Sequence, residues 1–435
     1  MRILLWHGYL LRGSGSNVYT ANIARAWRDE GHDVLVMCQE RDPDALEIFQ
    51  QTEGTGRCIL RRPEIGRVLP VYVYDHYEGF EAKLFIDLSS DELQRYTDRN
   101  VAELIDALTS FDPDAFITGH EVMGPEIARL ACSETGHPYL AKLHGSALEY
   151  AVKKQQRYAA LARSGLGAAL TVVGGSRYMV AEAAAHIPGW DDRAAVVNPG
   201  CDVSLFCPVE RKPGAPKVGF VGKLIASKGV HDLLGALPLV QAKHESIIVG
   251  YGGFRDGLER LASALQAGDL DAAREVAELG EQGRLEHLAA FLEDPPPGYV
   301  KAASALEITF TGRLEHGPLA QVLPTLDVLV VPSVVPEAFG MVAAEAAASG
   351  VLPIVPNHSG IAEAGAAVEE AIGRPGFLTY DASDPIRGIA AAIDRVLALD
   401  AEERREMERT AVELARERWS WTQVARRLLD LATRA

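Results

Sequence analysis

Cysteine is scarce in this chain. The five cysteines are odd in number, and no two form a C-x-x-C pair. A structural zinc site or a disulfide framework needs paired, regularly spaced cysteines, so the pattern argues against both and favours a reducing, cytoplasmic location. The residues are Cys38, Cys58, Cys132, Cys201 and Cys207.

Long apolar runs and excess basic charge are also missing. No stretch approaches 18 uncharged apolar residues, so we expect no transmembrane helix, and the short run at residues 2–6 predicts a first strand rather than a signal peptide. The formal net charge of -17 argues against a nucleic-acid partner and against attraction of the whole surface to anionic membranes. A local basic patch still leaves peripheral membrane contact open.

What is present is typical of a globular α/β protein. The 435 residues predict two or three domains at about 150 residues each. Apolar runs alternate with amphipathic stretches. Residues 17–31, for example, predict a helix with Tyr19, Ile23 and Trp27 on one face. This alternation predicts parallel sheets with helices on both faces.

The alternation is interrupted once, which suggests a domain boundary. The segment FCPVERKPGAPK, Phe206 to Lys217, is proline-rich and charged like a linker, and a second strand–helix series follows it. We therefore expect one Rossmann-like domain at 1–205 and another at 206–417. Residues 266–305 are charged, helical in pattern and interrupted by PPPG, which predicts an inserted helical hairpin on the surface.

Candidate ligand-binding residues follow the predicted strands. Ligands of open parallel sheets bind beyond the carboxyl ends of the strands. His7, His120 and His144 each follow a predicted strand, where a histidine either contacts a ligand or bonds a neighbouring loop. In VGKLIASKG, Lys223 and Lys228 lie just past another strand, where two ammonium groups suit a diphosphate, although solvated surface lysines are the alternative.

A glycine loop precedes the first helix. The backbone N–H groups of Gly13–Gly15 could hold an anion there. The loop half-matches the dinucleotide motif G-x-G-x-x-G, with Glu40 as a possible ribose-binding acid, but Val18 replaces the third glycine. A nicotinamide-dependent dehydrogenase and a plain turn are therefore both alternatives at this loop.

The stretch PEAFGMVAAEAAASG, residues 336–350, carries two acids among small residues. It follows the buried strand VLVVPS, and we expect a helix to start near Phe339 or Gly340 with its N–H groups toward a ligand. Glu337 precedes that helix and Glu345 lies within it, at most ~12 Å apart along a helix. Because carboxylates accept hydroxyl groups, the pair predicts an extended, sugar-containing ligand. The alternative is that Glu345 faces water.

These motifs together resemble glycosyltransferase family 4, the retaining nucleotide-sugar transferases of the GT-B fold. The E-x7-E element above is the most specific match, and VGKLIASKG is similar to the phosphate-binding segment, with Lys223 where the family usually has arginine. KLHGSALEY around His144, the turn VVNPGCDVSLF, the loop GSGSNVYTANIARAW and the closing helix WSWTQVARRLL extend the resemblance to nearly the whole chain. It implies two Rossmann-like domains facing across a cleft, for acceptor and donor, with a C-terminal helix (418–435) crossing back to the first.

The resemblance also implies roles for individual residues. It implies a hexosyltransferase that uses a UDP- or GDP-sugar without a metal or other cofactor, with the leaving phosphate taking the acceptor's proton. The implied catalytic residues are His144, Glu337, Lys223 and Lys228. The implied donor-binding residues are Gly15, Ser16, Arg313, Leu314, Phe339, Gly340, Met341, Val342 and Glu345. The acceptor would meet Asn17, His120 and Ser146.

Other functions remain open at this stage. Basic residues at 57–67 and 153–157 favour a small or phosphorylated acceptor, although solvated surface charge explains them equally well. A GT-B nucleotide-sugar epimerase, a phosphorylase and a non-catalytic nucleotide-sugar-binding protein are alternatives to a transferase. Asp112 and Asp114 resemble the D-x-D metal site of another glycosyltransferase fold, but they precede a strand, so we interpret them as a turn.

Overall fold

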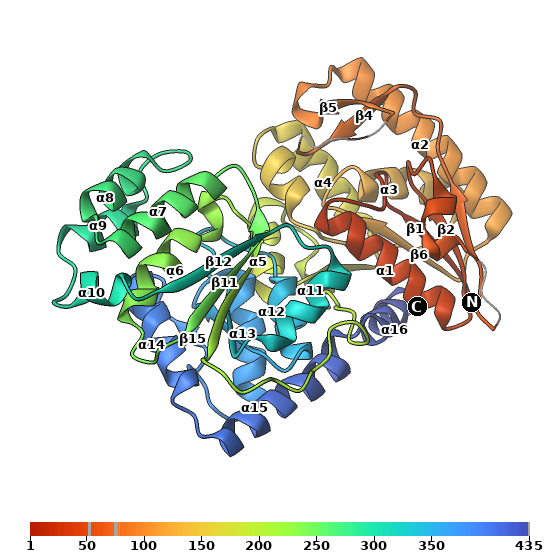
Figure 1. Cartoon of the computed structure of the whole chain (residues 1–435). Helices are drawn as coiled ribbons and strands as arrows, with labels where there is room; N and C mark the ends of the chain where they lie inside the picture. Colours follow the sequence, from red (N-terminus) through yellow and green to blue (C-terminus); the bar gives the residue numbers. More distant parts are fainter. Residues whose placement is uncertain (51–53, 74–76, 78, 434–435) are drawn as a thin grey trace. The chain divides into compact units, whose positions relative to one another are not determined.

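The computed structural model describes residues 1–433 except 51–53, 74–76 and 78. The chain forms two compact units: unit 1 is Met1–Pro199 with Trp421–Ala435, and unit 2 is Gly200–Ser420. Each unit is built on a parallel β-sheet with helical connections, which confirms the predicted α/β class (Figure 1).

Unit 1 contains a seven-stranded sheet of order β3-β2-β1-β6-β7-β8-β9, with every neighbouring pair parallel. The central strands are apolar and buried on both faces, as parallel sheets require. A separate parallel pair, β4 and β5, lies outside this sheet. The strands are β1 (Arg2–Trp6), β2 (Asp33–Met37), β3 (Cys58–Arg61), β4 (Val68–Val71), β5 (Glu81–Leu84), β6 (Ala115–Gly119), β7 (Leu140–Lys142), β8 (Thr171–Gly174) and β9 (Ala194–Val196).

The strand order of unit 1 reverses at β1, between β2 and β6, so right-handed crossovers place helices on both faces. Helix α1 buries Tyr19, Ile23 and Trp27, as its sequence pattern predicted. The C-terminal helix α16 packs beside it, and the Trp27 indole donates to the Ala425 carbonyl over 3.0 Å. The helices are α1 (Gly15–Asp29), α2 (Ser90–Phe111), α3 (Gly124–Thr135), α4 (Gln156–Ala168), α5 (Arg177–His186) and α16 (Trp421–Ala432).

Unit 2 contains a six-stranded parallel sheet of order β12-β11-β10-β13-β14-β15. Its order reverses at β10, between β11 and β13, which makes the carboxyl end of β10 a switch point where ligands bind in such sheets. The strands are β10 (Lys217–Lys223), β11 (Glu245–Tyr251), β12 (Glu307–Gly312), β13 (Val328–Val330), β14 (Leu352–Pro356) and β15 (Thr379–Tyr380).

The segment 266–305 is not a surface hairpin. It completes the crossover between β11 and β12 as the end of α7 and three further helices, whose apolar faces join the core of unit 2 through Val276, Leu288, Leu292 and Tyr299. The many exposed charged residues of the segment suggested a surface hairpin, although its apolar residues form a buried helical face. The helices of unit 2 are α6 (Val230–Ala236), α7 (Arg255–Ala267), α8 (Leu270–Leu279), α9 (Glu286–Glu293), α10 (Tyr299–Ala303), α11 (His316–Val322), α12 (Met341–Ala348), α13 (Ser359–Ala371), α14 (Pro385–Leu397) and α15 (Ala401–Leu414).

The chain passes between the units at 199/200 and 420/421, not at the expected linker 206–217. Phe206 is buried in the core of unit 2, and Arg211 bonds Glu408 and the carbonyls of Pro324 and Gly350. These contacts fix the proline-rich segment to unit 2, although its composition suggested a linker.

The predicted closing helix also starts later than expected. Helix α16 begins at Trp421 rather than at 418, because the preceding π-helical turn η9 (Ala415–Trp419) buries Trp419 in unit 2. Cys201 N donates to the Trp419 carbonyl over 2.7 Å, so the two crossing segments are bonded within unit 2. Residues 434–435 of the predicted helix lie outside the described residues.

Candidate donor-binding and histidine sites

Two lysines lie at the switch point of unit 2. Lys223 ends β10 and is exposed, and Lys228 ends the 3₁₀ turn η6 (Ala226–Lys228) that follows. The Lys228 ammonium group lies 2.8 Å from Glu337 Oε1, and the side chains of the two residues are 30% and 16% exposed. The structure therefore brings one predicted phosphate-binding lysine into an ion pair with one predicted sugar-binding acid.

Glu337 is held by several further bonds. Its carboxylate also accepts from the Ser333 hydroxyl, and its backbone N–H donates to Ser359 Oγ over 3.0 Å. His358 Nε2 lies 3.1 Å from the Ser333 carbonyl oxygen. The loop between β13 and α12 is thus tied to the start of α13, which fixes the Glu337 carboxylate in place. Such fixed polar groups lose little conformational entropy when a ligand binds.

Gly229, directly after Lys228, holds the two loops together. It has a φ of 69°, and a Cβ there would lie 1.8 Å from the Pro332 carbonyl oxygen.

We expect Gly229→Ala to lower the free energy of unfolding of unit 2 by about 2–4 kcal/mol, because the left-handed backbone and the clash with the Pro332 carbonyl both disfavour an alanine side chain. Urea unfolding measures this. The matched control is Gly317→Ala in α11, where the structure is open and alanine should be neutral or slightly stabilising. Equal stability of the two variants would contradict the expectation.

Helix α12 begins where the sequence predicted. Gly340 is its N-cap with a φ of 84°, and a Cβ there would lie 2.0 Å from Ile361 Cδ1. Phe339 turns its ring into the core of unit 2, 5.7 Å from the Trp419 ring in an edge-on arrangement. Met341 and Val342 are half-buried. The backbone groups for which the family resemblance implied contact with a ligand follow directly after this anchored ring, at the start of α12.

Glu345 lies in the middle of α12 among buried alanines. Its side chain is half-buried, and within the described residues its carboxyl group has no hydrogen bond or ion pair. Burial raises the pKa of Glu345 to about 7. An acid kept close to neutral without a partner is costly unless a ligand supplies one. The alternative that Glu345 simply faces water does not fit this burial.

The remaining predicted donor residues of unit 2 also lie at the carboxyl ends of its strands. Lys223 is in register with Tyr251 on β11, and the Arg313 guanidinium, just after β12, lies 5.0 Å from the centre of the Tyr251 ring. Arg313 also pairs with Glu315 at 2.8 Å, and Leu314 packs against the core. Tyr251 was not predicted, although its place at the end of the strand SIIVGY offered the same signal as that of Lys223.

In unit 1, the glycine loop leads into α1, with Gly15 and Ser16 in its first turn and Ser14 as its N-cap. Asn17 is buried. Its Oδ1 lies 2.8 Å from His7 Nε2, and its Nδ2 donates to the Arg12 carbonyl over 2.6 Å. Asn17 therefore orients both His7 and the loop. The oxygen and the nitrogen of its side-chain amide each already have a hydrogen-bond partner within unit 1.

The structure gathers the three strand-end histidines into one aromatic cluster. The ring centre of His120 lies 5.7 Å from that of His7 and 4.8 Å from that of His144, and Tyr9 and Tyr72 pack against His120 at 5.2 Å. His7 and His120 are buried, whereas His144 is half-buried, as is Ser146, which lies 3.5 Å from His120 Nδ1. Of the three histidines, His144 is the one with accessible surface.

Burial keeps these histidines neutral. It lowers the pKa of His7 to about 4 and the pKa values of His120 and His144 well below 6.5, and for His120 and His144 the neighbouring histidine rings add to the effect. A neutral His144 offers a hydrogen bond to a sugar hydroxyl but no charge at pH 7.

Two buried ionisable residues beside the cluster were not predicted. Glu121 Oε1 accepts from the backbone N–H groups of His144 and Gly145 over 3.0 and 2.6 Å, and burial raises the pKa of Glu121. Lys142 is buried, which lowers its pKa to about 7. Glu121 follows His120 directly after a buried strand, so its position in the sequence could have identified it. Lys142 lies within a predicted strand, and nothing in the sequence around it indicates that it is buried.

Neither a metal-binding cluster nor a membrane-spanning helix occurs among the described residues. No group of three or more His, Cys, Asp or Glu side chains there could hold a metal ion. None of the helices among the described residues combines the length and apolar character needed to span a bilayer.

Asp112 forms the left-handed end of α2, and Asp114 accepts from the Arg2 N–H over 2.7 Å, which confirms the predicted turn before β6.

Two units with Rossmann-like parallel sheets, one with two lysines and a fixed carboxylate at its switch point, define a protein of the GT-B class. Two family models match the chain: "Glycosyl transferase 4-like domain" at residues 14–200 and "Glycosyl transferases group 1" at residues 301–413, together more than half of its length. The chain therefore belongs to the GT-B glycosyltransferases, which confirms the family resemblance of its motifs.

Curated relatives agree with this assignment over part of their length. The chain is 29% identical to D-inositol 3-phosphate glycosyltransferase of Nocardioides sp. over 259 residues, 56% of this chain and 49% of that protein. It is 29% identical to glycogen synthase of Mycobacterium tuberculosis over 174 residues, 39% of this chain and 33% of that protein. The chain thus spans between a third and a half of the length of these relatives.

Solved structures share the fold along the whole chain. Sucrose-phosphate synthase from Thermosynechococcus elongatus has a TM-score of 0.63 at 18% identity, covering 99% of this chain and 98% of that one. HepE of Anabaena, solved in complex with UDP, has a TM-score of 0.64 at 16% identity, covering 99% of both chains. At these identities, the comparison defines the fold alone.

Proposed function

We propose that this protein is a retaining transferase that moves a sugar from a nucleoside diphosphate sugar to a hydroxyl acceptor. The observation that carries the proposal is the Lys228–Glu337 ion pair at the switch point of unit 2, beside the start of α12. A cation for the leaving phosphate and an acid for sugar hydroxyls are fixed there within 2.8 Å of each other. The Anabaena relative named above has been solved with UDP and with UDP-glucose, which supports UDP as the first nucleotide to test.

The donor would lie along the carboxyl edge of the unit 2 sheet. In this proposal, Glu337 accepts sugar hydroxyls, Lys223 and Lys228 contact the diphosphate, Glu345 meets the ribose, and the base lies beside Arg313 and Leu314. Backbone N–H groups at Met341 and Val342 add positive potential near the phosphates. In unit 1, Gly15 and Ser16 would contact the diphosphate, and His144 and Ser146 would face the transferred sugar and the acceptor.

The proposed reaction balances without an added cofactor. The bond between the sugar C1 and the β-phosphate oxygen breaks, and the acceptor oxygen bonds to C1 on the same face. The acceptor's proton passes to the departing phosphate, so no protein base is required. Negative charge builds on the phosphate as the bond breaks, and the two lysines and the α12 N–H groups would stabilise that charge.

Calorimetric titration with UDP-, GDP- and ADP-glucose tests the donor site. We expect one nucleotide class to bind saturably, and Glu345→Ala to weaken that binding at least tenfold, because hydrogen bonds to a charged group contribute about 1.5–3 kcal/mol. Tyr251→Phe is the control for Glu345→Ala, because it changes a residue at the same end of the sheet but keeps the aromatic ring. A folded protein that binds none of the three nucleotides would contradict the proposal.

The stereochemistry is tested separately by NMR. With an α-linked donor and water as the acceptor, the first sugar released should be the α-anomer. A β-anomer as the first product would overturn the retaining mechanism. Binding without any turnover would favour the alternative of a non-catalytic nucleotide-sugar-binding protein.

A further inference from the structure

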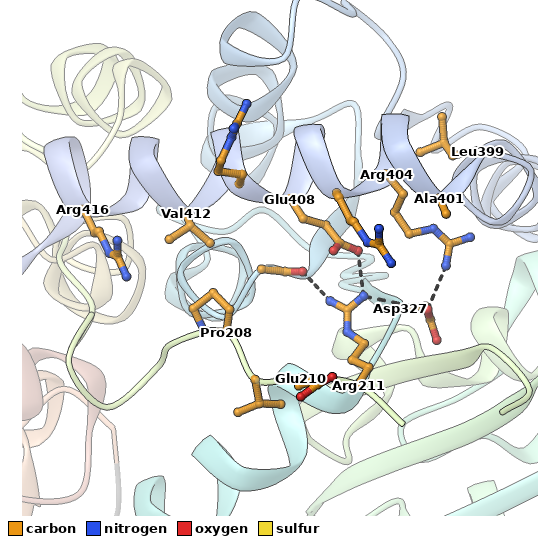
Figure 2. Close-up of a pocket in the computed structure, with 14 residues that line it drawn as sticks. Pro208, Glu210, Arg211, Asp327, Leu399, Ala401, Arg404, Glu408, Val412 and Arg416 are labelled. Atoms are coloured by element: carbon orange, nitrogen blue, oxygen red, sulfur yellow. Dashed lines mark hydrogen bonds and ion pairs between the residues drawn. The ribbon is translucent and has the colours of Figure 1, made fainter. Parts of the chain in front are cut away.

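A cavity lies toward the amino ends of the unit 2 strands, opposite the proposed donor site. It has a volume of about 770 Å³ and lies between α15, the segment at 208–211 and Asp327 (Figure 2). Asp327 immediately precedes β13, whereas Ser333 and Glu337 follow that strand. The cavity is therefore separated from the donor-binding edge by the length of the sheet, and none of its lining residues belongs to the donor site.

Arginines dominate the charge of this cavity. Its lining includes five of them, Arg211, Arg404, Arg405, Arg409 and Arg416, and no lysine. The acids in the lining are Glu210, Asp327 and Glu408. This local excess of positive charge occurs in a chain whose formal net charge is -17.

Two of the acids are already paired. Arg404 donates to Asp327 over 2.8 Å, and Arg211 donates to Glu408 over 2.7 Å, as the dashed lines in Figure 2 show. Arg211 also bonds the carbonyls of Pro324 and Gly350, so the cavity floor is braced before any ligand binds. The buried Arg404 Nε has no hydrogen-bond acceptor within the described residues.

Three arginines remain available. The guanidinium groups of Arg405, Arg409 and Arg416 are exposed and have no ion pair or hydrogen bond with any residue that the structure describes. Arg405 and Arg409 are four residues apart on α15, so they lie on the same helix face. Their like charges repel each other there, and a bound anion would remove that repulsion.

We propose that this cavity binds a small soluble phosphate monoester. A guanidinium presents a planar fork of N–H donors that matches phosphate oxygens, which explains the use of arginine without lysine. A phosphate monoester carries about 1.5 to 2 negative charges at pH 7, which suits the unpaired arginines. The concave shape and the volume fall in the range of small-molecule sites, about 300–1,000 Å³, and favour a soluble ligand over a flat membrane surface.

The test titrates glucose 6-phosphate and inorganic phosphate into the protein at physiological ionic strength. The double variant Arg405→Gln/Arg409→Gln should bind glucose 6-phosphate at least tenfold more weakly than the wild type, because charge-assisted hydrogen bonds are lost. Glutamine has nearly the same helix propensity as arginine, so α15 should remain intact, and the thermal midpoint checks this. Nucleotide binding at the donor edge should be unchanged.

Two control variants make the result specific. Arg260→Gln/Arg387→Gln removes the same charge from exposed positions outside this cavity and should change binding less than twofold. Arg405→Lys/Arg409→Lys keeps the charge but loses the forks, so its affinity should fall between those of the wild type and the glutamine variant.

The outcomes separate the proposal from its competitors. Equal weakening by the control pair, wild-type affinity in the lysine variant, or no binding of either phosphate at millimolar concentration would each overturn it. Binding to phosphatidylcholine vesicles with phosphatidic acid that depends on Arg405 and Arg409, without binding of glucose 6-phosphate, would overturn it in favour of a membrane-contact surface.

Discussion

Lys228→Met is expected to lower the turnover of the nucleotide sugar by about two to three orders of magnitude. Its ammonium group is paired with Glu337, and in the proposed donor site it contacts the leaving phosphate. Removing one preorganised group of this kind typically costs a factor of 10² to 10³ in kcat. Methionine keeps an unbranched side chain that is one atom shorter, and Ser333 still donates to Glu337, so the protein should remain folded.

Steady-state release of the nucleoside diphosphate measures the effect of Lys228→Met. Lys243→Met is the matched control, because it removes the same charge from a lysine that is 80% exposed and precedes β11, at the amino end of the strand rather than at the carboxyl end where the site lies. The control should keep wild-type turnover. A loss of less than threefold in Lys228→Met would show that the ion pair has a structural role and that Lys223 or the α12 N–H groups carry the phosphate charge.

A double-mutant cycle with Glu337→Gln then separates the two partners. If Lys228 acts on the phosphate and Glu337 on the sugar, both single variants should be strongly impaired and their effects should not add, because each residue also positions the other. Full additivity of the two effects would contradict this arrangement.

The fold followed from local patterns in the sequence. Buried runs such as ILLW and the apolar face formed by Tyr19, Ile23 and Trp27 identified strands and helices, and their alternation identified parallel sheets. The boundary was harder to place. Residues 206–217 look like a linker, but Arg211 ties them to unit 2 through partners more than 100 residues away, which local composition does not reveal.

Local composition was also misleading for the segment 266–305. Its charged residues and PPPG suggested a surface hairpin, but the helical face that carries Val276, Leu288 and Leu292 packs into the core. The structure of a crossover depends on the sheet that it covers, and that sheet comes from distant strands.

The candidate site was predictable in its chemistry but not in its pairings. Position after a strand marked Lys228, and the E-x7-E spacing marked Glu337 and Glu345. The ion pair between Lys228 and Glu337, separated by 109 residues, required three-dimensional coordinates. The burial of His120 was hidden for a similar reason, since Tyr9 and Tyr72 pack against it from other segments of the chain.

Glu345→Gln is expected to stabilise the protein above pH 7 and to have little effect near pH 4. The carboxyl pKa is about 7 in the folded state against 4.5 as its ordinary value, so the folded state binds more protons between these pH values. Stability is therefore lost as the pH rises from 4.5 through 7. A shift of this size corresponds to about 3 kcal/mol, and glutamine removes that cost because it does not ionise.

Urea unfolding of the wild type and Glu345→Gln from pH 4 to pH 9 measures this difference. Glu413→Gln, at an exposed position on α15, is the control and should show no pH-dependent gain. A constant difference between Glu345→Gln and the wild type across the pH range would contradict a buried, neutral Glu345.

The same carboxyl group should make nucleotide binding release protons. Ribose hydroxyls that donate to Glu345 would favour its ionised form and lower its pKa from about 7, so near pH 7 the wild type should release a fraction of a proton on binding. Calorimetry in two buffers of different ionisation enthalpy detects that release, and Glu345→Gln should abolish it while keeping one hydrogen-bond acceptor. Nucleotide binding without proton release in the wild type would place the ribose elsewhere. The loss of stability caused by the buried Glu345 carboxyl group would then have no role in donor recognition. Proton release that occurs in the wild type and disappears in Glu345→Gln would instead show that this loss of stability accompanies a carboxyl group positioned for the ligand.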